Sequence, residues 1–186
     1  MKLLLAKCFV GISCMLFIVG AYLIWERTNP DRLTLIPYTA PARLAGQPDT
    51  LTIPAAHISL PIYPAHLIGT HWDQTTRGVS YLVSSPLPGT QGNSVVYGHN
   101  WTNLLGPLNK VKPGDALFVK YGTNSMKFTV QFVGIVAANT MSIIAPTTDT
   151  RVTLYTCTGF LDSQRIVVTA IRDTPTTSAQ SAYSSV

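Results

Sequence analysis

Charged residues and cysteines are scarce in this chain of 186 residues. Asp, Glu, Lys and Arg together make up 11% of the sequence, against roughly 25% in an average soluble domain. Together with a hydrophobic share of 46%, this low charge excludes a disordered chain, a coiled coil and a heavily charged helical bundle. Three cysteines are too few for a disulfide scaffold. The net charge of +5 comes from scattered basic residues, so no nucleic-acid partner is expected.

Charge is also missing from one long stretch near the N-terminus. Cys8–Trp25 is an 18-residue run without a charged side chain, close to the ~20 residues that cross a bilayer as a helix. Lys2 and Lys7 lie on its N-terminal side, which favours a cytoplasmic N-terminus. Val19–Ala21 would also suit signal-peptide cleavage, but the apolar run continues beyond it, so we expect a retained anchor over residues 1–25. In either case the rest of the chain is extracytoplasmic.

The exported part of the chain then contains one thiol, Cys157, because Cys8 and Cys14 lie within the anchor. A lone exported cysteine is typical of a reactive thiol or of pairing between chains. The alternative is a small buried apolar side chain, which is a common role of free cysteine.

Beyond the anchor, the sequence divides into a linker, a β-rich domain and a tail. The Pro-rich residues 26–48 are expected to form an extended spacer, and the polar residues 174–186 a disordered tail. In residues 49–173, short β-branched and aromatic runs alternate with Gly, Pro, Asn and Asp. Eight such runs, with only brief helical segments such as one near Trp101–Leu108, predict an all-β, closed or nearly closed barrel. The expected strands are Thr50–Ile53, His57–Ile62, Gly78–Leu82, Ser94–Gly98, Ala116–Tyr121, Lys127–Ala137, Arg151–Thr156 and Arg165–Ile171.

Three separated residues, His99, Cys157 and Arg165, have side chains suited to thiol chemistry. A thiolate nucleophile needs a base or an imidazolium partner, and a cation or backbone donors that offset the developing oxyanion. In a hairpin whose turn centres on Leu161, Cys157 and Arg165 are each four residues from the centre, so they face each other on one side of the sheet. No such argument places His99, which lies 58 residues before Cys157.

The segments around these residues form a recognisable combination. RVTLYTC ends at Cys157, RIVVTA begins with an arginine eight residues later, and LPGTQGNSVVYGHN contains His99 after a glycine. Together with LTIPAAHISLPIY and LNKVKPGDALFV, these segments run from about Leu51 to Ile171 and cover nearly all of the exported domain. They resemble the sortases, membrane-anchored cysteine transpeptidases of Gram-positive-type cell surfaces, whose signature TLxTC ends in the nucleophile.

This resemblance implies an eight-stranded sortase-type β-barrel with short helices, preceded by one transmembrane helix in the cell membrane. His99, Cys157 and Arg165 would meet at one groove. Cys157 would cleave an LPXTG-like sorting signal of a secreted protein and form a thioester. His99 would protonate the departing amine and deprotonate the incoming one, from a peptidoglycan precursor or a pilin lysine. Arg165 would hold the substrate and its oxyanion, and Thr156 is a candidate substrate contact.

The chain also departs from relatives in ways that affect subclass and metal binding. Asn100 after Gly-His and Thr158 after the cysteine leave the subclass open, class D-like, class E-like or related. The acidic cluster that some relatives use for calcium is not evident, since Asp149 has no companion carboxylates nearby in the sequence. Because hard cations need several oxygen ligands, we expect no calcium and no other cofactor.

Two other functions are compatible with these residues. Cys157 and His99 could bind zinc with one or more of His57, His66 and His71, although no tight ligand spacing joins them. The chain could instead be a non-enzymatic anchored β module that binds a cell-wall component. Such a binder has no need of an exported thiol that faces an arginine.

The sorting motif and the acceptor amine depend on the shape of the groove. The loops Ala138–Thr150 and Thr158–Gln164 are expected to form its rim. Tyr97 and Tyr155 are candidate groove residues, with simple barrel packing as the alternative.

Overall fold

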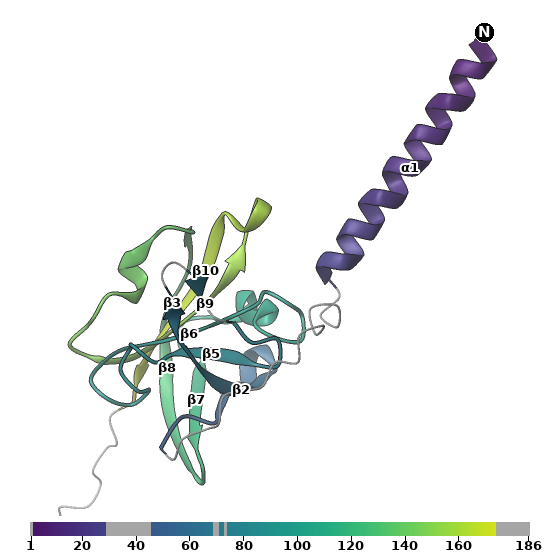
Figure 1. Ribbon diagram of the computed structural model, residues 1–186. Coiled ribbons are helices and arrows are strands. Elements are labelled where there is room, and N and C mark those ends of the chain that lie inside the picture. Colours follow the sequence, from purple (N-terminus) through teal and green to yellow (C-terminus); the bar gives the residue numbers. More distant parts are fainter. Residues whose placement is uncertain (1, 29–45, 69–70, 73, 174–186) are drawn as a thin grey trace, which may run out of the picture. The chain divides into compact units, whose positions relative to one another are not determined.

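The computed structural model describes residues 2–28, 46–68, 71–72 and 74–173 (Figure 1). The chain divides into an N-terminal unit and a second unit that contains the β domain, and each is described by itself. The expected tail, 174–186, and most of the expected linker, 29–45, lie outside the described residues.

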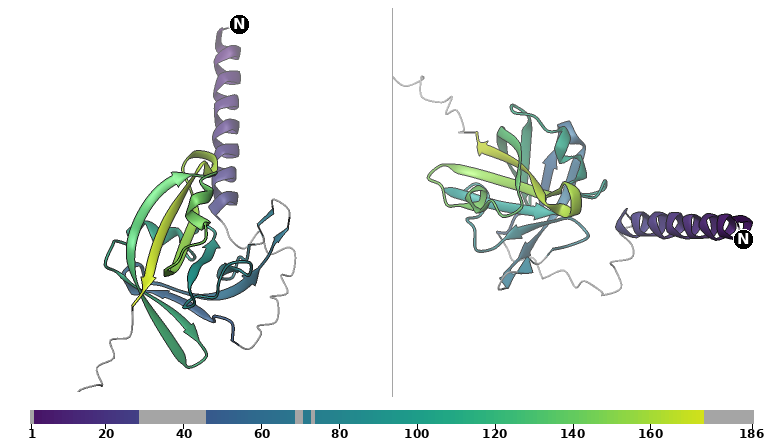
Figure 2. Two further views of the ribbon diagram at one scale, coloured as in Figure 1. Left: turned by 90° about the vertical axis from the view of Figure 1, so that its left-hand side faces the viewer. Right: turned by 90° about the horizontal axis from the view of Figure 1, so that it is seen from above.

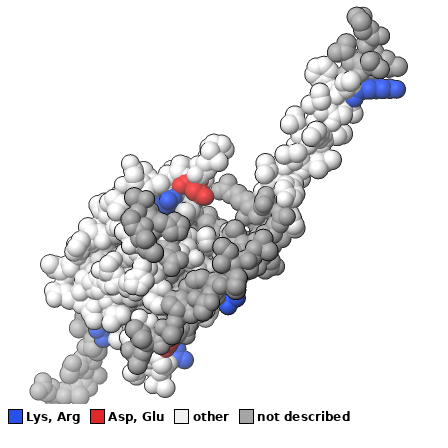
Figure 3. Space-filling view, viewed as in Figure 1, with Lys and Arg blue, Asp and Glu red and all other residues white. Residues whose placement is uncertain are grey.

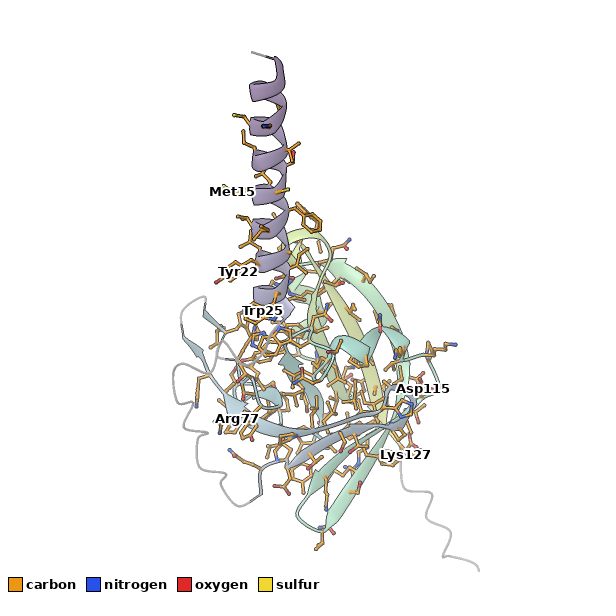
Figure 4. All side chains as sticks on the ribbon, turned by 90° about the vertical axis from the view of Figure 1, so that its right-hand side faces the viewer. Met15, Tyr22, Trp25, Arg77, Asp115 and Lys127 are labelled. Atoms are coloured by element: carbon orange, nitrogen blue, oxygen red, sulfur yellow. The ribbon has the colours of Figure 1, made fainter. Side chains whose placement is uncertain are left out.

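The N-terminal unit contains one long helix, α1, over Lys2–Thr28. Within it, the 19 residues Lys7–Trp25 are long and apolar enough to cross a membrane, and none of them is buried. At about 1.5 Å per residue their length matches the hydrocarbon core of a bilayer. Side chains stand out on both sides of the helix, among them Met15 and Tyr22 (Figure 4). The helix continues three residues beyond the expected boundary at residue 25.

The second unit is built on a closed barrel of eight strands, as the sequence predicts (Figures 1 and 2). Around the barrel the order is β1-β2-β5-β6-β9-β10-β8-β7, with β2–β5 and β6–β9 parallel and the other described pairs antiparallel. The strands are β1 Thr50–Ile53, β2 Ile58–Ala65, β5 Val79–Leu82, β6 Gly92–Gly98, β7 Ala116–Tyr121, β8 Asn124–Ala137, β9 Thr150–Thr158 and β10 Gln164–Arg172.

Alternate residues of each strand fill the barrel because successive side chains in a strand point to opposite faces. In β9, Val152 and Leu154 are fully buried in the main core. In β10, the alternating Ile166, Val168 and Ala170 belong to the same core. This alternation fixes which residues point outward, and Cys157 and Arg165 are among these.

Four short 3-10 helices connect the strands: η2 Pro54–Ala56, η3 Gly106–Lys110, η4 Met141–Ile144 and η5 Phe160–Asp162. The helix expected near Trp101–Leu108 is therefore shorter and begins later, at Gly106. Leu105 and Leu108, from the segment that follows β6, are buried in the main core.

A hairpin that the sequence analysis missed lies between β2 and β5. Its strands, β3 Leu67–Ile68 and β4 His71–Trp72, have two residues each. Trp72 packs on a second, smaller apolar cluster that includes Val95 and Tyr97 of β6. Because the intervening Val96 belongs to the main core, this second cluster lies on the outer face of the barrel wall.

Candidate active site

Cys157 and Arg165 face each other across an antiparallel hairpin, as predicted. Cys157 lies near the end of β9, Arg165 near the start of β10, and the two are a direct register pair. The turn between them contains η5, in which Leu161 and Asp162 both adopt positive φ angles, 51° and 59°. Direct cross-strand partners have Cβ atoms about 4.5–5.5 Å apart, so the side chains of Cys157 and Arg165 start next to each other on the same face of the sheet.

The parallel pairing of β6 and β9 brings His99 to the same place. Its last register pair joins Gly98 to Thr156, and His99 and Cys157 each follow by one residue. Neighbouring strands lie about 4.8 Å apart, so the C-terminal ends of β6 and β9 run side by side at this point. His99, Cys157 and Arg165 therefore gather at one end of the three adjacent strands β6, β9 and β10.

Thr156 joins the ends of β6 and β9 from the inside of the barrel. Its side chain is 1% exposed, and its hydroxyl donates a 2.7 Å hydrogen bond to the carbonyl of Gly98. Thr156 also lines the groove described below. Substrate contact by Thr156 stays a prediction, whereas its hydrogen bond joins the two strands that end at His99 and Cys157.

The imidazole of His99 is held in a half-buried position. Its ring stacks on Trp101, with ring centroids 4.4 Å apart and planes inclined by 8°. Burial lowers the pKa of His99 because it disfavours the charged imidazolium, and the carboxylate of Asp162 opposes this by raising it. The neutral form is therefore favoured near neutral pH, and neutral imidazole can accept a proton from a thiol or an amine.

The guanidinium of Arg165 is oriented by the turn that it follows. Its Nη1 donates hydrogen bonds to the carbonyls of Asp162, at 2.7 Å, and Gln164, at 2.8 Å. A guanidinium carries five N–H donors, so donors beyond these two bonds can serve a substrate. A cation fixed beside Cys157 can stabilise negative charge that develops on a carbonyl oxygen attacked by the sulfur.

A groove leads away from Cys157 along the outer face of the barrel. It holds about 550 Å³ of space, part of it open to solvent, and both Cys157 and Arg165 line it. Tyr97 and Tyr155 also line the groove. From the sequence, this position and simple barrel packing are the two alternatives. Their rings stack 5.5 Å apart. Burial raises the pKa of Tyr155, so its phenol stays neutral.

Trp72 and the loop between β8 and β9 complete this groove. Trp72 meets the rings of Tyr97 and Tyr155 edge to face, at centroid distances of 5.1 and 5.9 Å. The loop contributes Met141 and Ile144. Aromatic rings in this arrangement give a rigid, uncharged surface, which suits an apolar peptide segment.

Of the other candidate ligands, His57, His66 and Asp149 have described side chains. Among the residues that the structure describes, no three His, Cys, Asp or Glu side chains come together in a way that would hold a metal ion. His57 is exposed at the left-handed turn after η2, and His66 is exposed after β2. Asp149 forms an ion pair with Arg151, whose hydrogen bond lowers the pKa of that carboxyl group.

The face of the molecule in Figure 3 has few charged side chains among its described residues, and they do not form a broad patch. This distribution agrees with the scattered charge in the sequence.

Comparisons with known proteins point to one family. The family model for the sortase domain matches residues 51–173. Sortase A of Listeria monocytogenes is 28% identical over 111 residues, which cover 58% of this chain and 48% of that protein. The chain thus spans about half the length of this relative.

Solved structures similar to the chain are also sortases. Listeria monocytogenes sortase A has a TM-score of 0.58 and 26% identity, covering 67% of this chain and 86% of the other. Sortase C-1 of Actinomyces oris has a TM-score of 0.58 and 30% identity, covering 67% and 72%. Sortase A of Corynebacterium diphtheriae has a TM-score of 0.58 and 28% identity, covering 70% and 62%.

Proposed function

The chain belongs to the sortase family, and from this we propose that it is a membrane-anchored cysteine transpeptidase. It would cleave an LPXTG-like sorting signal in secreted proteins and transfer the acyl group to an amine of a peptidoglycan precursor or of a pilin lysine. The observation that carries this proposal is the convergence of His99, Cys157 and Arg165 at the ends of β6, β9 and β10.

In the first half-reaction, His99 takes the proton of the Cys157 thiol, and the resulting thiolate attacks the carbonyl carbon of the Thr–Gly-type bond. The negative charge that forms on the carbonyl oxygen is stabilised by the guanidinium of Arg165. When the tetrahedral intermediate collapses, the C–N bond breaks, His99 protonates the leaving amine, and a thioester remains on Cys157.

In the second half-reaction, an acceptor amine attacks the thioester. Neutral His99 takes the proton from this amine, the new amide bond forms, and the thiolate of Cys157 leaves. The lowered pKa of His99 supports this role because it keeps the imidazole able to accept a proton near neutral pH.

The surroundings of the three residues support a peptide substrate of this kind. The aromatic side chains of Trp72, Tyr97 and Tyr155 line the groove beside Cys157. They suit the apolar residues and the proline with which an LPXTG-like signal begins. Each chemical step is assigned to a side chain of the chain itself, so we propose that no metal or other cofactor is required.

The helix α1 supports an anchored protein. We propose that Lys7–Trp25 spans the cell membrane once, with the N-terminus in the cytoplasm and the barrel outside it. Residues 29–48, which follow α1, would serve as the linker and residues 174–186 as a tail.

The proposal is tested by transpeptidation with the full chain in detergent micelles. Sorting-motif peptides are offered with glycine-terminated or lysine amines, and the products are separated and identified by mass. We expect product from wild type and from Cys14→Ala, which removes a thiol from α1, and none from Cys157→Ala. A wild-type chain that binds the peptides but cleaves none of them would favour the non-enzymatic binding module.

A further inference from the structure

Asn93, at the second position of β6, lies at the other end of that strand from His99. Its side chain is 3% exposed and makes three hydrogen bonds. The amide nitrogen donates to the carbonyls of Ile143 and Ala145, each at 3.0 Å. The amide oxygen accepts a 2.7 Å bond from the hydroxyl of Thr153. Both N–H donors and the amide oxygen of this buried side chain are therefore used.

The two carbonyls that Asn93 binds belong to the loop that forms one wall of the groove. This loop, residues 138–149, joins β8 to β9 and contains η4. Its residues Met141, Ile143 and Ile144 line the groove that reaches Cys157. Ile144 also packs on the apolar cluster that contains Tyr97.

Further bonds attach the same loop to the start of β6. The backbone N–H of Gly92 donates to the carbonyl of Asp149 at 2.7 Å, and the side chain of Gln91 donates to the carbonyl of Thr148 at 2.9 Å. These contacts hold the C-terminal part of the loop. Asn93 alone among these three residues reaches η4, the part that faces the groove.

The position of η4 depends on such an external bond. A 3-10 helix of four residues has poor internal hydrogen-bond geometry and does not hold its shape by itself. Met141 is exposed, and Ile143 and Ile144 are only half-buried, so packing on the apolar cluster constrains the loop only in part. The buried side-chain amide of Asn93 supplies a further constraint. It donates one hydrogen bond to Ile143 in η4 and one to Ala145, the residue after η4.

We propose that Asn93 is a positioning residue that sets the apolar wall of the substrate groove and thereby determines affinity for the residues before the scissile bond. This inference rests on the proposed transpeptidase function. Asn93 touches no reacting atom and acts through the placement of Ile143 and Ile144.

The substitution Asn93→Asp tests the proposed bonds, because the carboxylate has the same shape but cannot donate to the two carbonyls and instead repels them. Asn124→Asp makes the same chemical change at an exposed position in the β7–β8 hairpin and serves as the matched control. Thr153→Val, a milder variant, removes only the hydroxyl that orients the amide of Asn93.

Steady-state kinetics with a sorting-motif peptide and the full chain give the main readout. For Asn93→Asp we expect KM to rise about tenfold, because the loop loses both hydrogen bonds from the amide nitrogen, with kcat changed by less than about twofold. The ratio of kcat/KM for peptides with Leu and with Ala at the first position of the motif should decrease as well. Alkylation of Cys157 by iodoacetamide, which does not need the groove wall, should keep the wild-type rate.

Backbone hydrogen exchange over residues 138–149 provides a readout that is independent of activity. Faster exchange in Asn93→Asp and in Thr153→Val, but not in Asn124→Asp, supports the inference. Unchanged exchange in this loop, or an unchanged KM in a folded Asn93→Asp protein, overturns it. If wild type itself forms no product, the proposed function fails, and the exchange measurement still decides the role of Asn93.

Discussion

The environment of His99 decides how the candidate site handles protons. Burial disfavours the imidazolium and lowers the pKa of His99, while the carboxylate of Asp162 raises it. The stacked indole of Trp101 covers one face of the ring. A histidine with these neighbours is held in place and is mainly neutral near pH 7.

The opposing effects on His99 can be separated by titration. In a Cys157→Ala background, where the thiol does not titrate with the imidazole, we expect the pKa of His99 to lie below its ordinary value of about 6.5. Asp162→Asn should lower the pKa of His99 further, because the substitution removes the carboxylate charge that raises it. NMR of the ring protons against pH measures both values. Asp115→Asn, which alters a carboxylate in a different turn, should leave the titration unchanged, and a rise in Asp162→Asn would contradict the account.

Arg165 is predicted to act through its guanidinium geometry and not through charge alone. Arg165→Lys keeps the charge but loses the planar set of donors, so we expect kcat/KM to fall by about 10²–10³. Arg172→Lys, at the far end of the same strand, is the control, since Arg172 binds the carbonyl of Gly89 instead. Transpeptidation rates within about threefold of wild type for Arg165→Lys would rule out this role.

At the scale of strands, the parallel pair β6–β9 is what unites the candidate site. It carries His99 and Cys157 side by side although they are 58 residues apart in the sequence. The hydrogen bond from Thr156 to Gly98 lies at the last register pair, one residue before both. Separation of these strand ends would therefore move the imidazole away from the sulfur.

The contribution of the Thr156–Gly98 hydrogen bond to stability can be measured by removing its donor. Thr156→Val retains the shape of the side chain but leaves the buried Gly98 carbonyl without this donor. We expect the free energy of unfolding to fall by about 1–3 kcal/mol, measured by urea denaturation. Thr123→Val, at the exposed β7–β8 turn, should change it by less than about 0.5 kcal/mol. Equal stability of wild type and Thr156→Val would show that the bond contributes little.

The sequence predicts the local parts of this arrangement well. All eight expected strands form the barrel, and β1 and β7 have the predicted bounds. The pairing of Cys157 with Arg165 follows from a short turn, because register in a hairpin is set by loop length. The approach of His99 depends on a parallel pairing between distant strands, for which the sequence contains no comparable local rule.

The sequence also did not predict the hairpin β3–β4 or the contact between Asn93 and the loop. The hairpin β3–β4 has strands of two residues, too short to give an alternating pattern. The bonds from Asn93 join a strand to a loop some 50 residues later in the chain. An asparagine near the start of a strand is an ordinary turn residue in a sequence, so only its burial reveals the contact.

At the scale of the whole molecule, the chain combines a helix long enough to span a membrane with a separate β-barrel unit. The barrel contains the candidate chemistry, and the helix would restrict it to the membrane surface. Such a location suits the proposed reaction, in which a secreted protein is joined to an amine outside the cytoplasm.

The orientation of the helix can be tested directly. With the N-terminus in the cytoplasm, protease added to intact protoplasts should release the barrel and leave α1 in the membrane. Protease added to inverted vesicles should leave the barrel intact. Immunodetection of tags at the two ends of the chain distinguishes these results, and the reverse pattern would contradict the proposed topology.

The proposed mechanism requires that Cys157 carries the acyl group from the cleaved amide to an acceptor amine. The most direct measurement is the mass of the peptide that contains Cys157, after the full chain has been incubated with a sorting-motif peptide, quenched in acid and digested. The account predicts added mass equal to the motif up to its threonine, which disappears when an amine is supplied and never forms in Cys157→Ala. Two results would contradict this mechanism. The motif is cleaved but the acyl group is found on a residue other than Cys157, or the motif is cleaved and the quenched protein carries no acyl group.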